Sequence, residues 1–217
     1  SLVTQGYDWG PAVYKVILHT GVDIQANTLT KDTFKVLAER TYPTVNMQTK
    51  QKYTGADSAS RTVNRVYLSD EKGNASEQPI GQYITIEMKV HPDAVTSSPF
   101  TFDLGTFTNK YVDLQYTVVQ QKSLQDTEGN TIDNLTTRPD TPHTMIEQGV
   151  DMFDTTGKFN YKDAKYGQIN LTYASYLPDT SKKKPLIIWL HGAGEGGTDP
   201  RIALLGNKVT SLAGESI

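Results

Sequence analysis

The chain of 217 residues contains no cysteine. This absence excludes structural disulfides, thiolate nucleophiles and metal sites built on cysteine. A long hydrophobic run is also missing. The longest, residues 186–190, is far shorter than the ~20 apolar residues that a membrane-spanning helix needs. We therefore expect no membrane-spanning helix, and no cofactor or metal ion is indicated by the residues present.

An excess of one charge is equally absent. There are 21 Lys and Arg against 24 Asp and Glu, which gives a formal net charge of −3. No basic stripe suggests a nucleic-acid partner, and no acidic block suggests a charged tail. Residues Ser1 to Thr4 carry no signal-peptide pattern, so any such peptide has been removed or never existed. The 12 Tyr and 17 Gly favour a surface-rich β protein and a secreted or cell-surface bacterial origin.

Helical periodicity is not evident before about residue 145, whereas strand periodicity is. Apolar residues occupy every second position from Ile84 to Val90 and again from Val112 to Val118, as in strands with one buried face. Shorter strands are predicted at residues 12–18, 34–38 and 63–68. Gly and Asn in the segments 70–74 and 126–130 indicate turns. Short strands with polar turns predict an all-β sandwich.

A different pattern follows the polar segment 136–142, which we interpret as a linker. Residues 157–163 and 169–177 are predicted to form two antiparallel strands joined by a turn at 165–167. The apolar run 186–190 does not alternate, and a run of this kind is typical of a central strand covered on both faces. Asp199 and Pro200 are predicted to cap and begin a short helix. Gly206 and Asn207 should break it, with a second helical start near Thr210.

The sequence His191-Gly192-Ala193-Gly194 after this predicted strand suggests acyl-transfer chemistry. Glycines let backbone N–H groups approach the negative charge that develops on a substrate carbonyl oxygen. The N–H groups of Ala193 and Gly194 are the candidate oxyanion-hole donors, and the sequence does not separate them; Gly192 is expected to shape the turn. A phosphate loop and a dinucleotide fingerprint both fail on spacing.

The stretch 184–199 closely resembles bacterial esterases of the α/β-hydrolase class, of the carbohydrate-esterase and phospholipase/carboxylesterase type. Some of these carry an N-terminal immunoglobulin-like domain, which residues 9–13, 65–74 and 81–84 resemble. The resemblance implies an immunoglobulin-like sandwich over residues 1–140, followed by the incomplete N-terminal part of an α/β-hydrolase domain over 141–217. It also implies a Gly-x-Ser-x-Gly nucleophile, an acid and a histidine further along. This sequence has no Gly-x-Ser-x-Gly.

The resulting hypothesis is the N-terminal portion of a serine esterase that acts through an acyl-enzyme. The expected partners are an ester substrate and the C-terminal half of the same precursor, which would carry the Ser/Asp/His triad. That half could be separated by a cut near residues 214–216, or the chain could be a shortened form. Feruloyl, acetyl and aliphatic esters all remain open. The alternative is a non-catalytic sandwich that binds a polysaccharide or a protein.

Three polar residues of the loop have competing interpretations. For Glu195, a substrate contact competes with a structural carboxylate that accepts from nearby backbone amides. His191 is expected to anchor the loop, because the order of triad residues in the resembling family argues against a catalytic base here. Asp199 is expected to cap the helix.

Overall fold

Strands make up most of the described chain. The computed structural model describes residues 1–137, 143–177, 181, 183 and 185–213. The strands are β1 (Leu2–Tyr7), β2 (Gly10–Gln25), β3 (Phe34–Val45), β4 (Lys52–Arg61), β5 (Val63–Ser69), β6 (Ile80–Met88), β7 (Phe100–Asp103), β8 (Thr108–Tyr111), β9 (Asp113–Gln120), β10 (Leu124–Gln125), β11 (Thr131–Ile132), β12 (Met145–Glu147), β13 (Asp154–Asp163) and β14 (Gly167–Ser175). The helical elements are the α-helix α1 (Pro200–Gly206) and the 3₁₀ turns η1 (Ala26–Thr28), η2 (Val95–Ser97), η3 (Val150–Met152), η4 (Ala193–Glu195) and η5 (Val209–Ala213).

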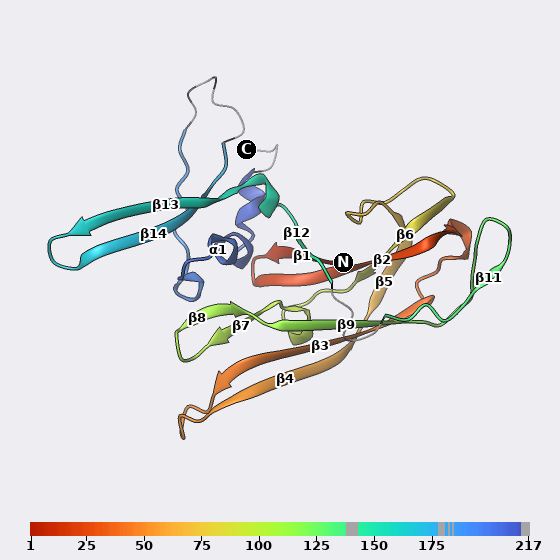
Figure 1. The fold of residues 1–217 in the computed structure, drawn as a ribbon, viewed down its shortest axis with the longest axis horizontal. Coiled ribbons are helices and arrows are strands. Elements are labelled where there is room, and N and C mark those ends of the chain that lie inside the picture. The colour runs from red at the N-terminus through yellow and green to blue at the C-terminus, as the bar shows by residue number, and fades with distance from the viewer. Residues whose placement is uncertain (138–142, 178–180, 182, 184, 214–217) are drawn as a thin grey trace.

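Two sheets enclose the main core and form a sandwich (Figure 1). One has the strand order β12-β1-β2-β6-β5, and the other has the order β4-β3-β9. All pairings in these sheets are antiparallel except that of β12, which lies parallel to β1. Three two-stranded sheets complete the structure: β7-β8, β10-β11 and β13-β14. The fold is therefore mostly β, as the alternation in the sequence predicts.

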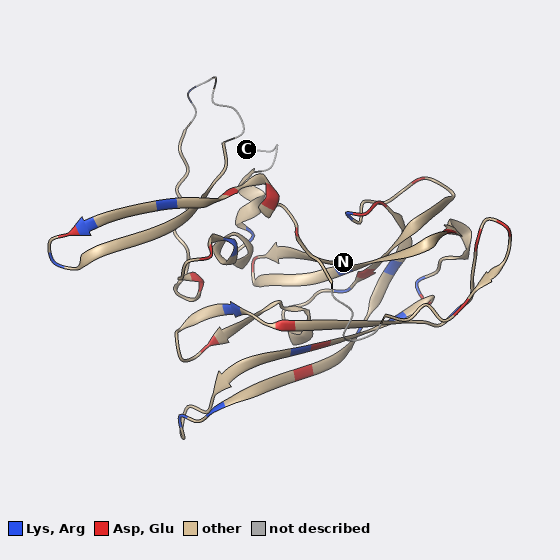
Figure 2. Cartoon of the chain, in the orientation of Figure 1, with Lys and Arg blue, Asp and Glu red and all other residues tan. Residues whose placement is uncertain are grey.

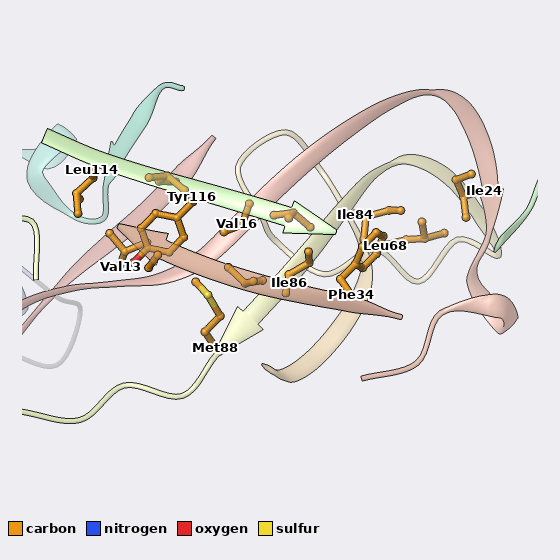
Figure 3. Close-up of a cluster of buried hydrophobic side chains, with 14 of the residues drawn as sticks. Val13, Val16, Ile24, Phe34, Leu68, Ile84, Ile86, Met88, Leu114 and Tyr116 are labelled. Atoms are coloured by element: carbon orange, nitrogen blue, oxygen red, sulfur yellow. The ribbon is translucent and has the colours of Figure 1, made fainter. Parts of the chain in front are cut away.

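The core contains the apolar faces that the alternation picks out (Figure 3). Ile84 and Ile86 are fully buried, and Met88 is 2% exposed. Opposite them lie the buried side chains of β9, which are Leu114, Tyr116 and Val118. Val90 differs from the prediction, because β6 ends at Met88 and Val90 is only partly buried.

Charged residues of both signs are spread over strands and loops (Figure 2), and few of them are buried. In the described part of the chain the buried charged side chains are Arg40, Arg61 and Glu195. Arg61 crosses the sandwich, where it donates to the Tyr116 hydroxyl at 2.6 Å and to the carbonyl oxygens of Val13 and Lys89 at 3.1 Å. Burial raises the pKa of Tyr116 to about 12, although Arg61 opposes this shift. These bonds tie together strands of both sheets.

The two predicted turns have the same construction. Asp70 and Asp126 each accept backbone hydrogen bonds from the residues two and four positions later. Gly73 and Gly129 both have φ of 82°, a conformation that favours glycine. The matching geometry explains why the same residue types recur in both segments.

The predicted linker, residues 136–142, begins within the sandwich. Thr136 forms a bridge with Val119, and the Thr137 amide donates to the Val118 carbonyl oxygen at 3.0 Å. Residues 138–142 lie outside the described part. Strand β12 follows the predicted domain boundary at residue 140 and yet joins the sandwich through β1. The boundary itself stays a prediction.

The C-terminal part consists of a hairpin and a short helix beside the sandwich. Strands β13 and β14 pair antiparallel, as predicted, and project away from the rest of the molecule (Figure 1). Helix α1 packs between β1 and β14, and a second core joins it to the sandwich. This core consists of Phe100, Val150, Ile202, Leu204, Leu205 and Val209. No helix among the described residues is long and apolar enough to cross a membrane.

The apolar run 186–190, predicted to be a buried central strand, forms no strand among the described residues. The run lies outside every strand, and its side chains are between 49% (Trp189) and 84% (Leu190) exposed. A strand needs a neighbour for its backbone N–H and C=O groups, and no described segment pairs with this run. Residues 182, 184 and 214–217, which include the proposed cut site, lie outside the described part.

The sandwich should fold without the segment that follows it. We expect residues 1–137 to give a β-type circular dichroism spectrum and a cooperative thermal transition, because the main core comes almost entirely from β1–β11. A longer chain, residues 1–148, should melt at a higher temperature, since β12 covers the edge of β1. A shorter chain without a cooperative transition would show that the sandwich is not an independent unit.

Candidate functional site

The candidate oxyanion loop forms a single 3₁₀ turn before helix α1. Gly192 precedes the turn with extended backbone, and η4 contains Ala193, Gly194 and Glu195. Gly192 and Ala193 are exposed, and Gly194 is half-buried. Among the described residues, no acceptor is bonded to the amide of Ala193 or Gly194.

The buried side chain of Glu195 stabilises this turn through hydrogen bonds. Its carboxylate oxygen Oε2 accepts from the Gly192 amide at 2.9 Å, and its own amide donates to the Gly192 carbonyl oxygen at 3.1 Å. The other carboxylate oxygen, Oε1, accepts from Nδ2 of Asn207, the residue after α1. The side chain is 8% exposed, and both carboxylate oxygens are bonded to protein donors. A contact of Glu195 with substrate stays a prediction.

Gly206 makes room for this carboxylate. A Cβ atom at Gly206 would lie 1.9 Å from Glu195 Oε1, closer than any two non-bonded atoms can come. The sequence predicts only a helix break at Gly206, because glycine inside a helix costs about 1 kcal/mol relative to alanine. The structure adds the reason: α1 ends directly against the Glu195 side chain.

His191 and Asp199 flank the turn in the sequence. The His191 ring is exposed, and its Nδ1 is 2.8 Å from the Gly192 carbonyl oxygen. Asp199 caps α1, as predicted, by accepting from the Arg201 amide at 3.0 Å. Among the described residues no three His, Asp or Glu side chains gather in a way that could hold a metal ion.

The sandwich contacts the loop through the β7–β8 hairpin. A Cβ atom at Gly194 would lie 3.3 Å from the Phe102 ring and 3.3 Å from the Asn109 side-chain nitrogen. Glycine at this position therefore lets the hairpin pack closely against the turn. The sequence did not reveal this contact, because β7 and β8 are too short to show periodicity and lie more than 80 residues before the loop.

A polar cluster then fixes the start of α1 to the sandwich. Arg201 bonds Asp199 through two side-chain nitrogens, with a shortest distance of 2.6 Å, and it lies 3.8 Å from Glu147 in β12. Glu147 accepts from the Tyr111 hydroxyl at 2.5 Å, and the Arg201 guanidinium lies over the Tyr111 ring at 5.4 Å. Hydrogen bonding to Arg201 lowers the pKa of Asp199. The cluster joins β8, β12 and α1, and it was not predicted either.

Gly206→Ala should destabilise the protein, although glycine-to-alanine changes inside helices normally stabilise it. The new Cβ would displace the Glu195 carboxylate from its donors, which costs about 1–3 kcal/mol for buried groups left unsatisfied. Urea unfolding measures the change. Gly81→Ala is the matched control, because its Cβ would meet only ordinary contacts at 3.7 Å and beyond. A more stable Gly206→Ala protein would contradict the packing described.

The raised pKa of Tyr111 should make the free energy of unfolding decrease at high pH. Burial, and next the hydrogen bond to Glu147, raise the pKa of Tyr111 above its usual value near 10. A raised pKa in the folded state gives stability that is present below about pH 10 and is lost as the pH rises further. Between pH 9 and 11 the unfolding free energy should therefore fall more steeply in the wild type than in Tyr111→Phe. Other tyrosines titrate in both proteins and cancel in the comparison; parallel curves would refute the assignment.

Comparison with known proteins agrees with this architecture. The family described as "Esterase Ig-like N-terminal domain" matches residues 1–133. A crystal structure described as that of a thermostable esterase superposes with a TM-score of 0.71 and 27% sequence identity. The alignment covers 95% of this chain and 50% of that one, so the chain spans about half the length of this relative. No curated protein matches the sequence. With more than half of its length matched, the chain belongs to the family of esterase immunoglobulin-like N-terminal domains.

Proposed function

We propose that the full-length protein is a serine esterase that hydrolyses carboxylic esters through an acyl-enzyme, and that the turn at 192–194 is part of its oxyanion hole. The observation that carries the proposal is the pair of amides at Ala193 and Gly194, which donate to no described residue and lie on a turn that Glu195 fixes from its buried side. Backbone donors that are positioned before the reaction stabilise the charge that develops in acyl transfer. The family and the esterase relative both support an ester substrate.

The catalytic serine, acid and histidine would come from the C-terminal half of the same precursor. The esterase relative is about twice as long as the matched region, which leaves room for such a half. Exposed apolar side chains on the described part favour the same idea, because apolar surface often marks a contact with another part of a protein. They are Phe159, Leu171, Tyr173 and the run 186–190. Strands of the second half would pair with 186–190 and give it the buried environment that its sequence predicts.

In the proposed reaction the serine attacks the ester carbonyl and a histidine takes its proton. The carbonyl oxygen becomes negatively charged and accepts from the amide of Ala193 or of Gly194. A second donor, from the residue after the serine, is expected in this class of enzyme. The histidine gives this proton to the alcohol as it leaves, and water then hydrolyses the acyl-enzyme to release the acid and the serine hydroxyl, with the same donors in use.

Hydrolysis of a short p-nitrophenyl ester by the full-length protein tests the proposal. Gly194→Val should lower kcat by about 10²-fold or more, because its side chain would push the turn away from Phe102 and Asn109. Ala193→Pro removes one candidate donor at a position where proline is compatible with a helical start. Ala193→Ser keeps the amide and is the matched control, expected to retain activity.

Circular dichroism and thermal melting should show that these variants are folded. If Gly194→Val and Ala193→Pro both retain the wild-type kcat, the oxyanion assignment is wrong. If the folded full-length protein hydrolyses no ester, the alternative of a non-catalytic sandwich that binds a polysaccharide or a protein is favoured.

A further inference from the structure

Arg61 is a buried cation that has no carboxylate partner among the described residues. The residue is 6% exposed, and it donates to the Tyr116 hydroxyl and to the carbonyl oxygens of Val13 and Lys89. These acceptors are all uncharged near pH 7, because burial raises the pKa of Tyr116 to about 12. Buried charges are usually paired. The guanidinium group of Arg61 therefore lacks the counter-charge that its burial favours.

The nearby Arg40 shows the contrasting arrangement. It is 7% exposed, and its Nε donates to Asp57 Oδ2 at 2.8 Å. Asp57 lies directly opposite Arg40 where β3 and β4 pair, whereas the residue opposite Arg61 is the apolar Val36. The strand register thus provides a carboxylate for Arg40 and none for Arg61.

Arg61 lines a cavity of about 730 Å³ beside β4. The other lining residues come from β4 and from residues 62–96, and β4 is the outermost strand of its sheet (Figure 1). No described strand pairs with the outer side of β4, so alternate backbone N–H groups of this strand point away from β3. Backbone donors at the edge of a sheet favour the binding of an anion.

One donor of Arg61 remains available to a ligand. Nη1 and Nη2 make the three hydrogen bonds of this side chain, and Nε makes none with a described residue. Among the described residues, the side-chain atom that is sealed from solvent without a partner is Thr117 Oγ1. The Nε group of Arg61 is therefore accessible, although most of the side chain is buried.

The charges around the cavity favour a singly charged anion. The charged lining residues are Arg61, Lys89, Asp57 and Asp93, together with His91. Asp57 is already paired with Arg40. The Asp93 side chain is 91% exposed and lies 3.2 Å from His91. With His91 neutral, two positive charges therefore stand against one exposed negative charge, and one further negative charge would balance the site.

We propose that this cavity binds the carboxylate group of an organic acid, with Arg61 as its buried anchor and Lys89 as a second, exposed cation. A carboxylate carries the single charge that the site lacks, and hydrogen bonds between charged groups are the strong ones. The amides at the edge of β4 and the hydroxyl groups of Ser60 and Thr62 supply further donors. The site gives the immunoglobulin-like domain a binding function that does not depend on the esterase proposal.

Sodium acetate, titrated into the ¹⁵N-labelled chain of residues 1–217 and followed by NMR, tests the site. Amide signals of residues 57–62 and 89–91 should shift until they saturate. Acetamide, which has nearly the same shape and no charge, and sodium chloride at the same ionic strength should not reproduce these shifts. Lys89→Gln should weaken acetate binding by about threefold, as expected for an exposed ion pair. Arg61→Gln should abolish binding, and Arg61→Lys, which keeps the charge, should restore part of it.

Lys158→Gln is the matched control, because it removes an exposed positive charge from β13, outside the cavity. It should leave the affinity for acetate unchanged. Circular dichroism shows which variants fold, and if Arg61→Gln does not, the comparison of Lys89→Gln with Lys158→Gln decides. The proposal is overturned if acetate causes no saturable shift, if acetamide or chloride causes the same shifts, or if Lys89→Gln binds acetate as Lys158→Gln does. A folded Arg61→Gln protein with wild-type affinity would overturn it as well.

Discussion

The buried carboxylate of Glu195 is the feature on which the arrangement of the candidate site depends. A buried charge is stable only when donors surround it. Here the donors are the Gly192 amide on one side and the Asn207 side chain on the other. The same group therefore closes the turn that presents Ala193 and Gly194 and ties that turn to the end of α1. The turn has its shape before any substrate is present, which is what electrostatic stabilisation of a developing charge requires.

The sandwich extends this support to the other side of the loop. Phe102 and Asn109 lie against Gly194, while Tyr111 and Glu147 hold the start of α1 through Arg201. The second core packs Phe100 of β7 with apolar side chains of α1. In the described structure the loop is thus held both by the Glu195 bonds and by contacts with the immunoglobulin-like domain. The domain acts as a structural support of the candidate site.

The sequence predicted the parts of the fold that depend on local pattern. Alternation identified the buried faces of β6 and β9, and the Asp-Gly-Asn turns and the Asp199 cap follow from the chemistry of single residues. Contacts between distant segments could not be predicted, because nothing local to Gly194 or Arg201 indicates Phe102 or Glu147. For the run 186–190 the local sequence is clear, but it does not decide the structure. Its composition predicts a central strand, but a strand exists only where a neighbour pairs with it. The oxyanion role of residues 192–194 stays a prediction.

The most direct test is a crystal structure of the full-length protein after reaction with an alkyl phosphonate ester, which mimics the tetrahedral intermediate on the nucleophilic serine. The account predicts a phosphonyl oxygen within about 2.7–3.1 Å of the amide nitrogen of Ala193 or Gly194. The Glu195 bonds to Gly192 and Asn207 should remain in place. A phosphonyl oxygen that points away from this turn, or a serine far from it, would contradict the account.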